Sequence, residues 1–200
     1  MEEKVQFQSD DLKIEGLVRR NAGAKGVVIT HPHPQYGGDM YNPVVEAIEH
    51  AYHQRNITTL RFNFRGVGKS EGHYGDGIGE QQDVCGAIQY LHEQGVEQID
   101  LAGYSFGAWV NAHITPEAAP LKRMVMVSPP VAFMAFDAIR AIPQLSLVIS
   151  GSRDEIAPVN RIETLLPDWN PDAKFEKIAG ADHFYFGYFD ELASILDAHV

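Results

Sequence analysis

The sequence predicts an α/β fold in which helices cover both faces of a mostly parallel central sheet. Strand-like and helix-like segments alternate along most of the chain, which is the pattern of successive βαβ units. Several strand-like segments are continuous apolar runs, "GVVIT" at 26–30 among them, as expected of strands buried on both faces. The 200 residues fit a single domain, 1–200, with a substantial core.

The expected elements follow in chain order. Two short strands with alternating apolar and polar residues come first, joined by the turn "SDD". The first helix has Val45, Ile48 and Tyr52 at helical spacing and Pro43 in its first turn. Strands are expected at 4–8, 12–20, 26–30, 57–64, 98–104, 122–129, 144–151 and 173–180. Helices are expected at 42–55, 79–95, 158–169 and 188–200, with a further helical run at 106–114.

Composition narrows the class of function. The formal net charge is -11, and such a surface repels phosphate backbones and anionic lipid, so neither nucleic acid nor membrane is an expected partner. The first residues lack the apolar core of a signal peptide, and the longest apolar runs are too short to cross a bilayer. Cys85 is the single cysteine, which fits a reducing compartment. A cytoplasmic location is therefore expected.

The stretch "GYSFG", 103–107, carries a candidate nucleophile. It lies between an expected strand and a helical run, which is the setting that the G-x-S-x-G pattern requires. The sharp turn lifts the hydroxyl of Ser105 above the sheet edge. Side chains at Gly103 and Gly107 would collide where the strand and the helix cross. A Gly-Ser turn without chemical consequence is the alternative, and the strand–turn–helix setting favours the nucleophile.

A serine nucleophile needs a base and a group that orients this base. The expected chain order is serine, then an acid, then histidine. Asp154 follows the expected strand 144–151, and His183 follows the expected strand 173–180. We therefore expect Ser105, Asp154 and His183 to form a catalytic triad, in which His183 moves the proton and Asp154 fixes its tautomer.

Other roles remain open for the acidic residues. Asp154 could be a helix N-cap or an ion-pair partner, and the neighbouring Glu155 could then be the acid of the triad. Asp182 could serve only to cap its loop. Surface or structural roles are expected for the histidines in helical patterns, at the end of the chain or in a glycine-rich loop. These are His50, His53, His73, His92, His113 and His199.

The loop "HPHPQYGG", 31–38, directly follows the strand at 26–30, the place from which an oxyanion-hole donor is expected. Proline has no N–H, so only His31 and His33 can donate within 31–34, and His31 still borders the strand. We expect the backbone N–H groups of His33 and Phe106 to form the oxyanion hole. A metal on the two imidazoles is the alternative, but side chains at i and i+2 of an extended segment point apart, and no second ligand cluster is present.

Two nucleotide-binding patterns fail at positions with a physical role. The segment "GKS" at 68–70 resembles a P-loop, but Asn63 stands where that motif needs glycine. "GDGIGE" at 75–80 does not follow a strand, as a dinucleotide fingerprint must. Arg65 and Gly66 are expected to close the loop after the fourth strand. The aromatic segment 129–143, where such folds often insert a lid, is expected to pack in the core rather than on substrate.

With these motifs, the chain resembles the small, lid-less bacterial α/β-hydrolases related to the dienelactone-hydrolase and S33 aminopeptidase-like groups. The resemblance runs from about Gly26 to the end and rests on "HPHPQYGGDMYNPVV", "RFNFRGVGKSEG", "GYSFGA", "GSRDEIAP" and "ADHF". It implies an α/β-hydrolase fold without a large cap domain. It also implies that the catalytic roles belong to Ser105, Asp154 and His183, and the oxyanion hole to the 31–38 loop and Phe106. Dienelactone hydrolases have cysteine at the position of Ser105, and family members often have histidine where this chain has Phe186.

We therefore expect a serine hydrolase that acts on a small carboxylic ester or related acyl substrate through an acyl-enzyme, without a cofactor or metal. An ester is favoured over a peptide because the sequence has no obvious acidic cluster for a peptide amine. An amide or peptide hydrolase is one alternative, and a catalytically silent binding protein of the same fold is another. The expected partner is a small-molecule acyl substrate. The acyl chain, the leaving group and homo-oligomer formation stay open.

Overall fold

The predicted alternation of strands and helices is confirmed in a computed structural model, which describes residues 1–114 and 121–200. The strands are β1 Glu3–Ser9, β2 Leu12–Arg19, β3 Lys25–Thr30, β4 Thr58–Phe62, β5 Gln98–Tyr104, β6 Leu121–Val127, β7 Leu145–Gly151 and β8 Lys174–Ile178. The helices are α1 Pro43–Gln54, α2 Ile78–Glu93, α3 Phe106–Ala112, α4 Val159–Trp169 and α5 Phe189–His199, with a short 3₁₀ turn, η1 Pro34–Tyr36.

The strands form one sheet in the order β1-β2-β4-β3-β5-β6-β7-β8. The first two strands pair antiparallel with each other, and β2 pairs antiparallel with β4. All pairs from β4 to β8 are parallel. The carboxyl ends of the parallel strands therefore lie along one edge, where functional loops of such sheets gather.

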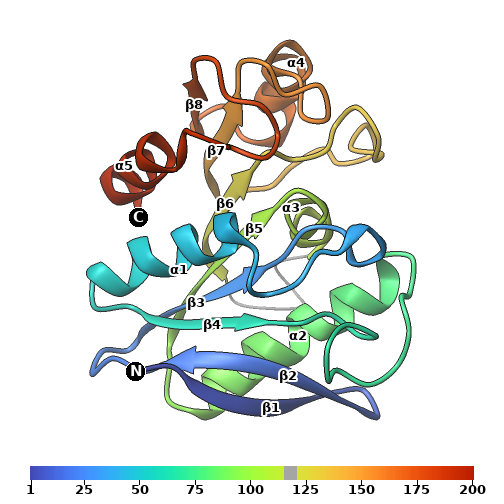
Figure 1. The fold of residues 1–200 in the computed structure, drawn as a ribbon, viewed down its shortest axis with the longest axis vertical. Helices are drawn as coiled ribbons and strands as arrows, with labels where there is room; N and C mark the ends of the chain where they lie inside the picture. The colour runs from blue at the N-terminus through green and yellow to red at the C-terminus, as the bar shows by residue number, and fades with distance from the viewer. Residues whose placement is uncertain (115–120) are drawn as a thin grey trace.

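The helices cover both faces of the sheet (Figure 1). One core contains the apolar sides of α1 and α5, and the other contains those of α2 and α3. Strand β3 shows how the sequence specifies this arrangement: Val27 and Ile29 pack in the first core, and Val28 packs in the second. Because successive side chains point to opposite faces, a strand covered on both sides must be apolar throughout.

Within residues 1–114 and 121–200, no cap domain covers the carboxyl edge of the sheet. Residues 128–144, between β6 and β7, make turns without a helix or strand. The aromatic side chains of this segment divide between two environments. Phe136 is buried against Trp169, with ring centroids 5.1 Å apart, whereas Phe133 is 76% exposed. No helix of the described residues is both long and apolar enough to cross a membrane.

Candidate active site

Ser105 lies in a sharp turn between β5 and α3. Its φ is 54° and its ψ is -119°, a backbone conformation that costs free energy for any residue other than glycine. A Cβ on Gly107 would lie 2.5 Å from the Thr30 hydroxyl and 2.7 Å from the Thr30 carbonyl oxygen, and one on Gly103 would be 2.5 Å from that hydroxyl. The crowding that the sequence predicts at both glycines is present. The turn therefore holds Ser105 at the carboxyl edge of the sheet.

The structure brings together the three residues that the sequence predicted as a triad. Asp154 follows β7 and His183 follows β8, and both side chains are buried. His183 Nε2 lies 2.9 Å from Ser105 Oγ, and His183 Nδ1 lies 3.0 Å and 2.9 Å from the two Asp154 carboxylate oxygens. An ionised carboxylate only accepts hydrogen bonds, so Nδ1 carries the proton and Nε2 accepts from the serine hydroxyl.

The Asp154 carboxylate is held in its ionised form. Burial by itself would raise its pKa, but the hydrogen bond and charge of His183, together with the hydrogen bonds from Ala157 and Ser128, outweigh this effect. The Ala157 N–H and the Ser128 hydroxyl, at 2.7 Å each, and the Ile156 N–H, at 2.9 Å, also donate to it. The net result is a pKa below the usual value of this carboxyl. A charged acid of this kind can stabilise a protonated His183.

Ser128 and Tyr185 belong to this network, and the sequence reasoning did not include them. The Ser128 hydroxyl lies 2.7 Å from Asp154 Oδ2 and 2.7 Å from the Tyr185 hydroxyl. Both residues are buried, and both have positive φ, 46° for Ser128 and 58° for Tyr185. The one sequence signal was position, since Ser128 follows β6 directly and Tyr185 stands two residues after His183.

The alternative acidic residues have other positions. Glu155 is exposed. Asp182 Oδ1 accepts hydrogen bonds from the backbone N–H groups of Phe184 and Tyr185, at 3.0 Å and 3.1 Å. Asp182 therefore caps its own loop, which was the alternative considered for it, and Asp154 is the acid that contacts His183.

The loop after β3 fixes its two histidines by different contacts. His31 is fully buried, with Nδ1 2.6 Å from the Pro32 carbonyl oxygen and Nε2 accepting from the Phe64 N–H at 3.0 Å. Burial lowers the pKa of His31 to about 4, so the ring is neutral and joins the loops that follow β3 and β4. His33 Nδ1 accepts from the Gln35 N–H at 3.2 Å, and His33 Nε2 lies 3.3 Å from the Tyr74 hydroxyl.

The two residues predicted to supply the oxyanion donors pack their side chains against each other near the nucleophile turn. The rings of His33 and Phe106 have centroids 4.7 Å apart. Within the described residues, the backbone N–H of His33 makes no hydrogen bond, and Phe106 opens α3, where an N–H has no partner inside the helix. Gly38 lets the loop close tightly, because a Cβ there would lie 2.1 Å from the Pro32 carbonyl oxygen.

The imidazole nitrogens of this loop are directed at groups of the protein itself. Both nitrogens of each ring already face a protein partner. Across residues 1–114 and 121–200, no group of three or more histidine, cysteine, aspartate or glutamate side chains is arranged to hold a metal ion.

The loop after β4 is braced from two sides. The Arg65 guanidinium donates to the buried Asp83 carboxylate of α2 at 2.8 Å, and the Arg65 backbone N–H donates to the same carboxylate at 2.9 Å. Gly66, with φ 77°, donates its N–H to the Glu71 carbonyl oxygen at 3.0 Å. Because Phe64 of this loop also donates to His31, α2 indirectly supports the loop that carries His33.

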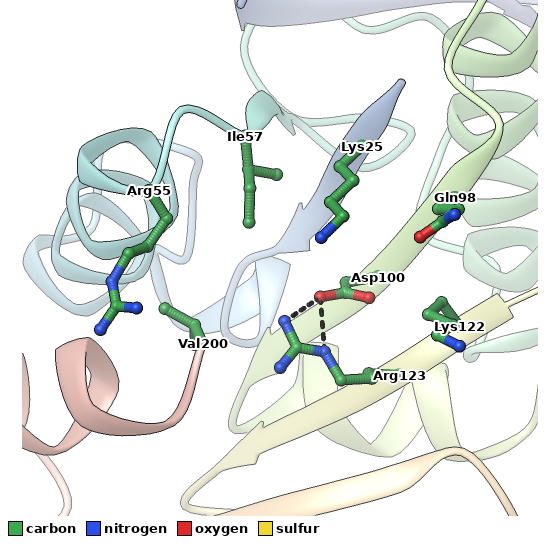
Figure 2. A pocket seen from close by; sticks show the side chains of 9 residues that line it. Lys25, Arg55, Ile57, Gln98, Asp100, Lys122, Arg123 and Val200 are labelled. Carbon is green, nitrogen blue, oxygen red and sulfur yellow. Dashed lines mark hydrogen bonds and ion pairs between the residues drawn. The ribbon is translucent and has the colours of Figure 1, made fainter. Parts of the chain in front are cut away.

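A polar hollow lies at the opposite edge of the sheet, where β3, β5 and β6 begin (Figure 2). It has a volume of about 460 Å³. The Arg123 guanidinium donates to the Asp100 carboxylate there at 2.7 Å. Its lining also includes Lys25, Arg55, Gln98 and Lys122. Since Ser105, Asp154 and His183 all follow strands rather than precede them, this hollow is separate from the candidate active site.

Comparison with known proteins identifies the family of the chain and its fold. The model of a family described as the alpha/beta hydrolase family matches residues 27–198. The chain is similar to an uncharacterized protein of Rickettsia prowazekii, with 28% identity over 194 residues, 91% of this chain and 82% of that protein.

Two solved structures are also similar over nearly the whole chain. One is an alpha-beta serine hydrolase homologue from Coxiella burnetii, with a TM-score of 0.91 and 31% identity, covering 99% of this chain and 97% of that one. The other is a serine hydrolase without a lid from Xanthomonas campestris, with a TM-score of 0.90 and 26% identity, covering 100% and 93%.

Proposed function

Because the chain belongs to the alpha/beta hydrolase family, we propose that it is a serine hydrolase that cleaves a small carboxylic ester through an acyl-enzyme. The observation that carries this proposal is the continuous hydrogen-bonded chain from Ser105 through His183 to Asp154. A nucleophile, a base and an orienting acid in this arrangement are the minimum set for acyl transfer by serine.

The geometry supports the following sequence of steps. His183 Nε2 takes the hydroxyl proton as Ser105 Oγ attacks the ester carbonyl carbon, and Asp154 stabilises the resulting imidazolium. The N–H groups of His33 and Phe106 donate to the oxyanion. His183 then gives the proton to the alcohol oxygen, the carbon–oxygen bond breaks and the acyl-enzyme remains. In the second half, His183 takes a proton from water as the water oxygen attacks the acyl carbon. His183 then gives this proton to Ser105 Oγ as the bond between Oγ and the acyl carbon breaks, which releases the carboxylic acid and restores Ser105.

Two other functions use the same fold. An amide or peptide hydrolase would need the same catalytic groups, and its peptide substrate would require a site for the rest of the chain. A silent binding protein would not need the serine, histidine and acid side chains to be hydrogen-bonded to one another in sequence. The 2.9 Å contact between His183 Nε2 and Ser105 Oγ, made from two distant segments of the chain, favours the enzyme.

A fluorophosphonate probe tests the nucleophile directly. We expect the unmodified protein to be labelled covalently and Ser105→Ala to remain unlabelled, with mass spectrometry placing the adduct on Ser105. Hydrolysis of p-nitrophenyl acetate, measured on the same samples, tests turnover. Equal labelling of both proteins, or no labelling of either, would contradict the proposal.

A further inference from the structure

The loop that carries His183 presents two exposed phenyl rings. Between Phe184 and Phe186 stands Tyr185, which is fully buried, whereas the two phenylalanines are 54% and 73% exposed. The Tyr185 hydroxyl bonds to Ser128, and its backbone N–H, like that of Phe184, is fixed by Asp182. Burial of the middle residue therefore holds its two neighbours at the surface.

The two rings form a continuous apolar surface that begins at the proposed base. Phe184 meets the ring of His183 at a centroid distance of 5.6 Å and an interplanar angle of 89°. Phe186 stacks on Phe184, at 6.2 Å and 28°. We call these two residues the phenyl pair. Large apolar side chains exposed together, rather than singly, mark binding surfaces, and aromatic rings offer a large contact area for apolar ligands.

The chemistry of the proposed reaction decides which part of the substrate lies here. When the acyl-enzyme forms, His183 donates its proton to the oxygen of the departing alcohol, so this oxygen must lie within hydrogen-bond reach of Nε2. The carbonyl oxygen points instead toward the N–H groups of His33 and Phe106. The alcohol therefore departs beside His183, and the phenyl pair begins at the ring of this same histidine.

From this position we infer that the phenyl pair binds the alcohol part of the ester, and that this part is apolar, an alkyl chain of several carbons or an aryl ring. The inference rests on the proposed serine hydrolase function and specifies one half of its substrate. Phe184 and Phe186 then determine specificity for the leaving alcohol, whereas the catalytic steps stay with Ser105, His183 and Asp154.

A series of acetate esters tests this inference. Ethyl, butyl and hexyl acetate give the same acetyl-enzyme and leave as primary alcohols of similar acidity, so kcat/KM compares contacts to the alcohol alone. A fully buried methylene raises kcat/KM about fourfold. For a chain that lies on an open surface we expect about half of that free energy, about twofold per methylene, which is about a fifteenfold rise over the four methylenes from ethyl to hexyl acetate.

Three variants make the test specific. Phe186→Ser should lower the ratio of hexyl to ethyl acetate kcat/KM at least threefold, and Phe186→Leu, which keeps an apolar side chain, should preserve most of it. Tyr41→Ser is the matched control, because Tyr41 is also an exposed aromatic residue, 50% exposed, but it lies over the Arg61 guanidinium. It should leave the ratio unchanged.

The outcomes separate this inference from the proposed function. Suppose that fluorophosphonate labels Ser105 but kcat/KM is the same for ethyl, butyl and hexyl acetate, or that Phe186→Ser keeps the wild-type ratio of hexyl to ethyl acetate kcat/KM. The alcohol-binding role is then wrong and the hydrolase function stands. If Ser105 is not labelled, both are wrong.

Discussion

The Ser128 hydroxyl donates a hydrogen bond to Asp154 Oδ2 over 2.7 Å. This single proton is thereby used, so the Tyr185 hydroxyl, 2.7 Å away, must donate to Ser128. Burial raises the pKa of the Tyr185 phenol, which keeps that proton in place. Hydrogen-bond donation in this network therefore runs one way, from Tyr185 to Ser128 and from Ser128 to Asp154. Of the six non-glycine residues with positive φ in the described chain, Ser105, Ser128 and Tyr185 lie at this site.

Ser128→Ala tests the contribution of this donor. A hydrogen bond to a charged group contributes about 1.5–3 kcal/mol, and we expect about a tenfold loss of kcat/KM for p-nitrophenyl acetate as Asp154 loses its fixed orientation. Ser146→Ala, which removes a hydroxyl of β7 that donates to the Met124 carbonyl oxygen of β6, should retain wild-type kcat/KM. Equal kcat/KM for wild type and Ser128→Ala would exclude a positioning role.

The neutral state of His31 predicts a loss of stability in acid. Burial lowers its pKa from 6.5 to about 4, so the unfolded chain binds a proton that the folded chain excludes. The contribution of His31 is therefore present above pH 6.5 and is lost as the pH falls toward 4, about 3 kcal/mol in all. The free energy of unfolding, measured with urea across this pH range, should fall less steeply for His31→Gln than for the wild type. His50→Gln, at an exposed position, should keep the wild-type slope, and an identical slope for His31→Gln would refute the assignment.

A pair of substitutions at His33 separates its backbone from its side chain. The φ of His33 is -58°, which proline also adopts. His33→Ala keeps the N–H and should retain a sizeable fraction of kcat. His33→Pro removes the same imidazole and also the N–H, and should lower kcat about a hundredfold, as expected for loss of an oxyanion donor. If the two variants have equal kcat, the donor is not this N–H.

Gly38→Ala should displace the same loop. The new methyl would lie 2.1 Å from the Pro32 carbonyl oxygen and 2.8 Å from that of His33, so the loop must shift, and a displacement of about 1 Å at a catalytic group costs about a hundredfold in rate. Gly23→Ala, whose nearest neighbours lie 3.9 Å away, is the control. Full kcat in Gly38→Ala would show that the loop conformation is not needed for turnover.

Local patterns predicted the elements because each strand and helix has its own apolar periodicity. The limits of β4 show where this reasoning ends. A strand was expected to continue through Phe64, but β4 ends at Phe62. Beyond it, the Asn63 side chain accepts from the Met40 N–H, and the Phe64 N–H bonds to His31 rather than to a neighbouring strand. These partners lie more than twenty residues away in the chain, and no local pattern encodes them.

In the candidate site, too, some residues could be predicted from the sequence and others could not. Ser105, Asp154 and His183 were predictable because strand ends in a parallel sheet meet at one edge, and motif and chain order identify the residues there. Ser128 was not, because a serine after a strand is common and its role depends on a positive φ and on a 2.7 Å contact with Asp154. The structural role of His31 likewise depends on Phe64, which belongs to another strand's loop.

The position of β8 has a consequence for synthesis and refolding. It is the outermost strand next to β7, and the loop that follows it supplies His183. A folding intermediate in which β5 and β7 have already paired with β6 would hold Ser105 and Asp154 near their final places but would lack a base. Under the proposed function, such an intermediate is inert toward esters, and the onset of fluorophosphonate labelling during refolding would report the docking of the last strand.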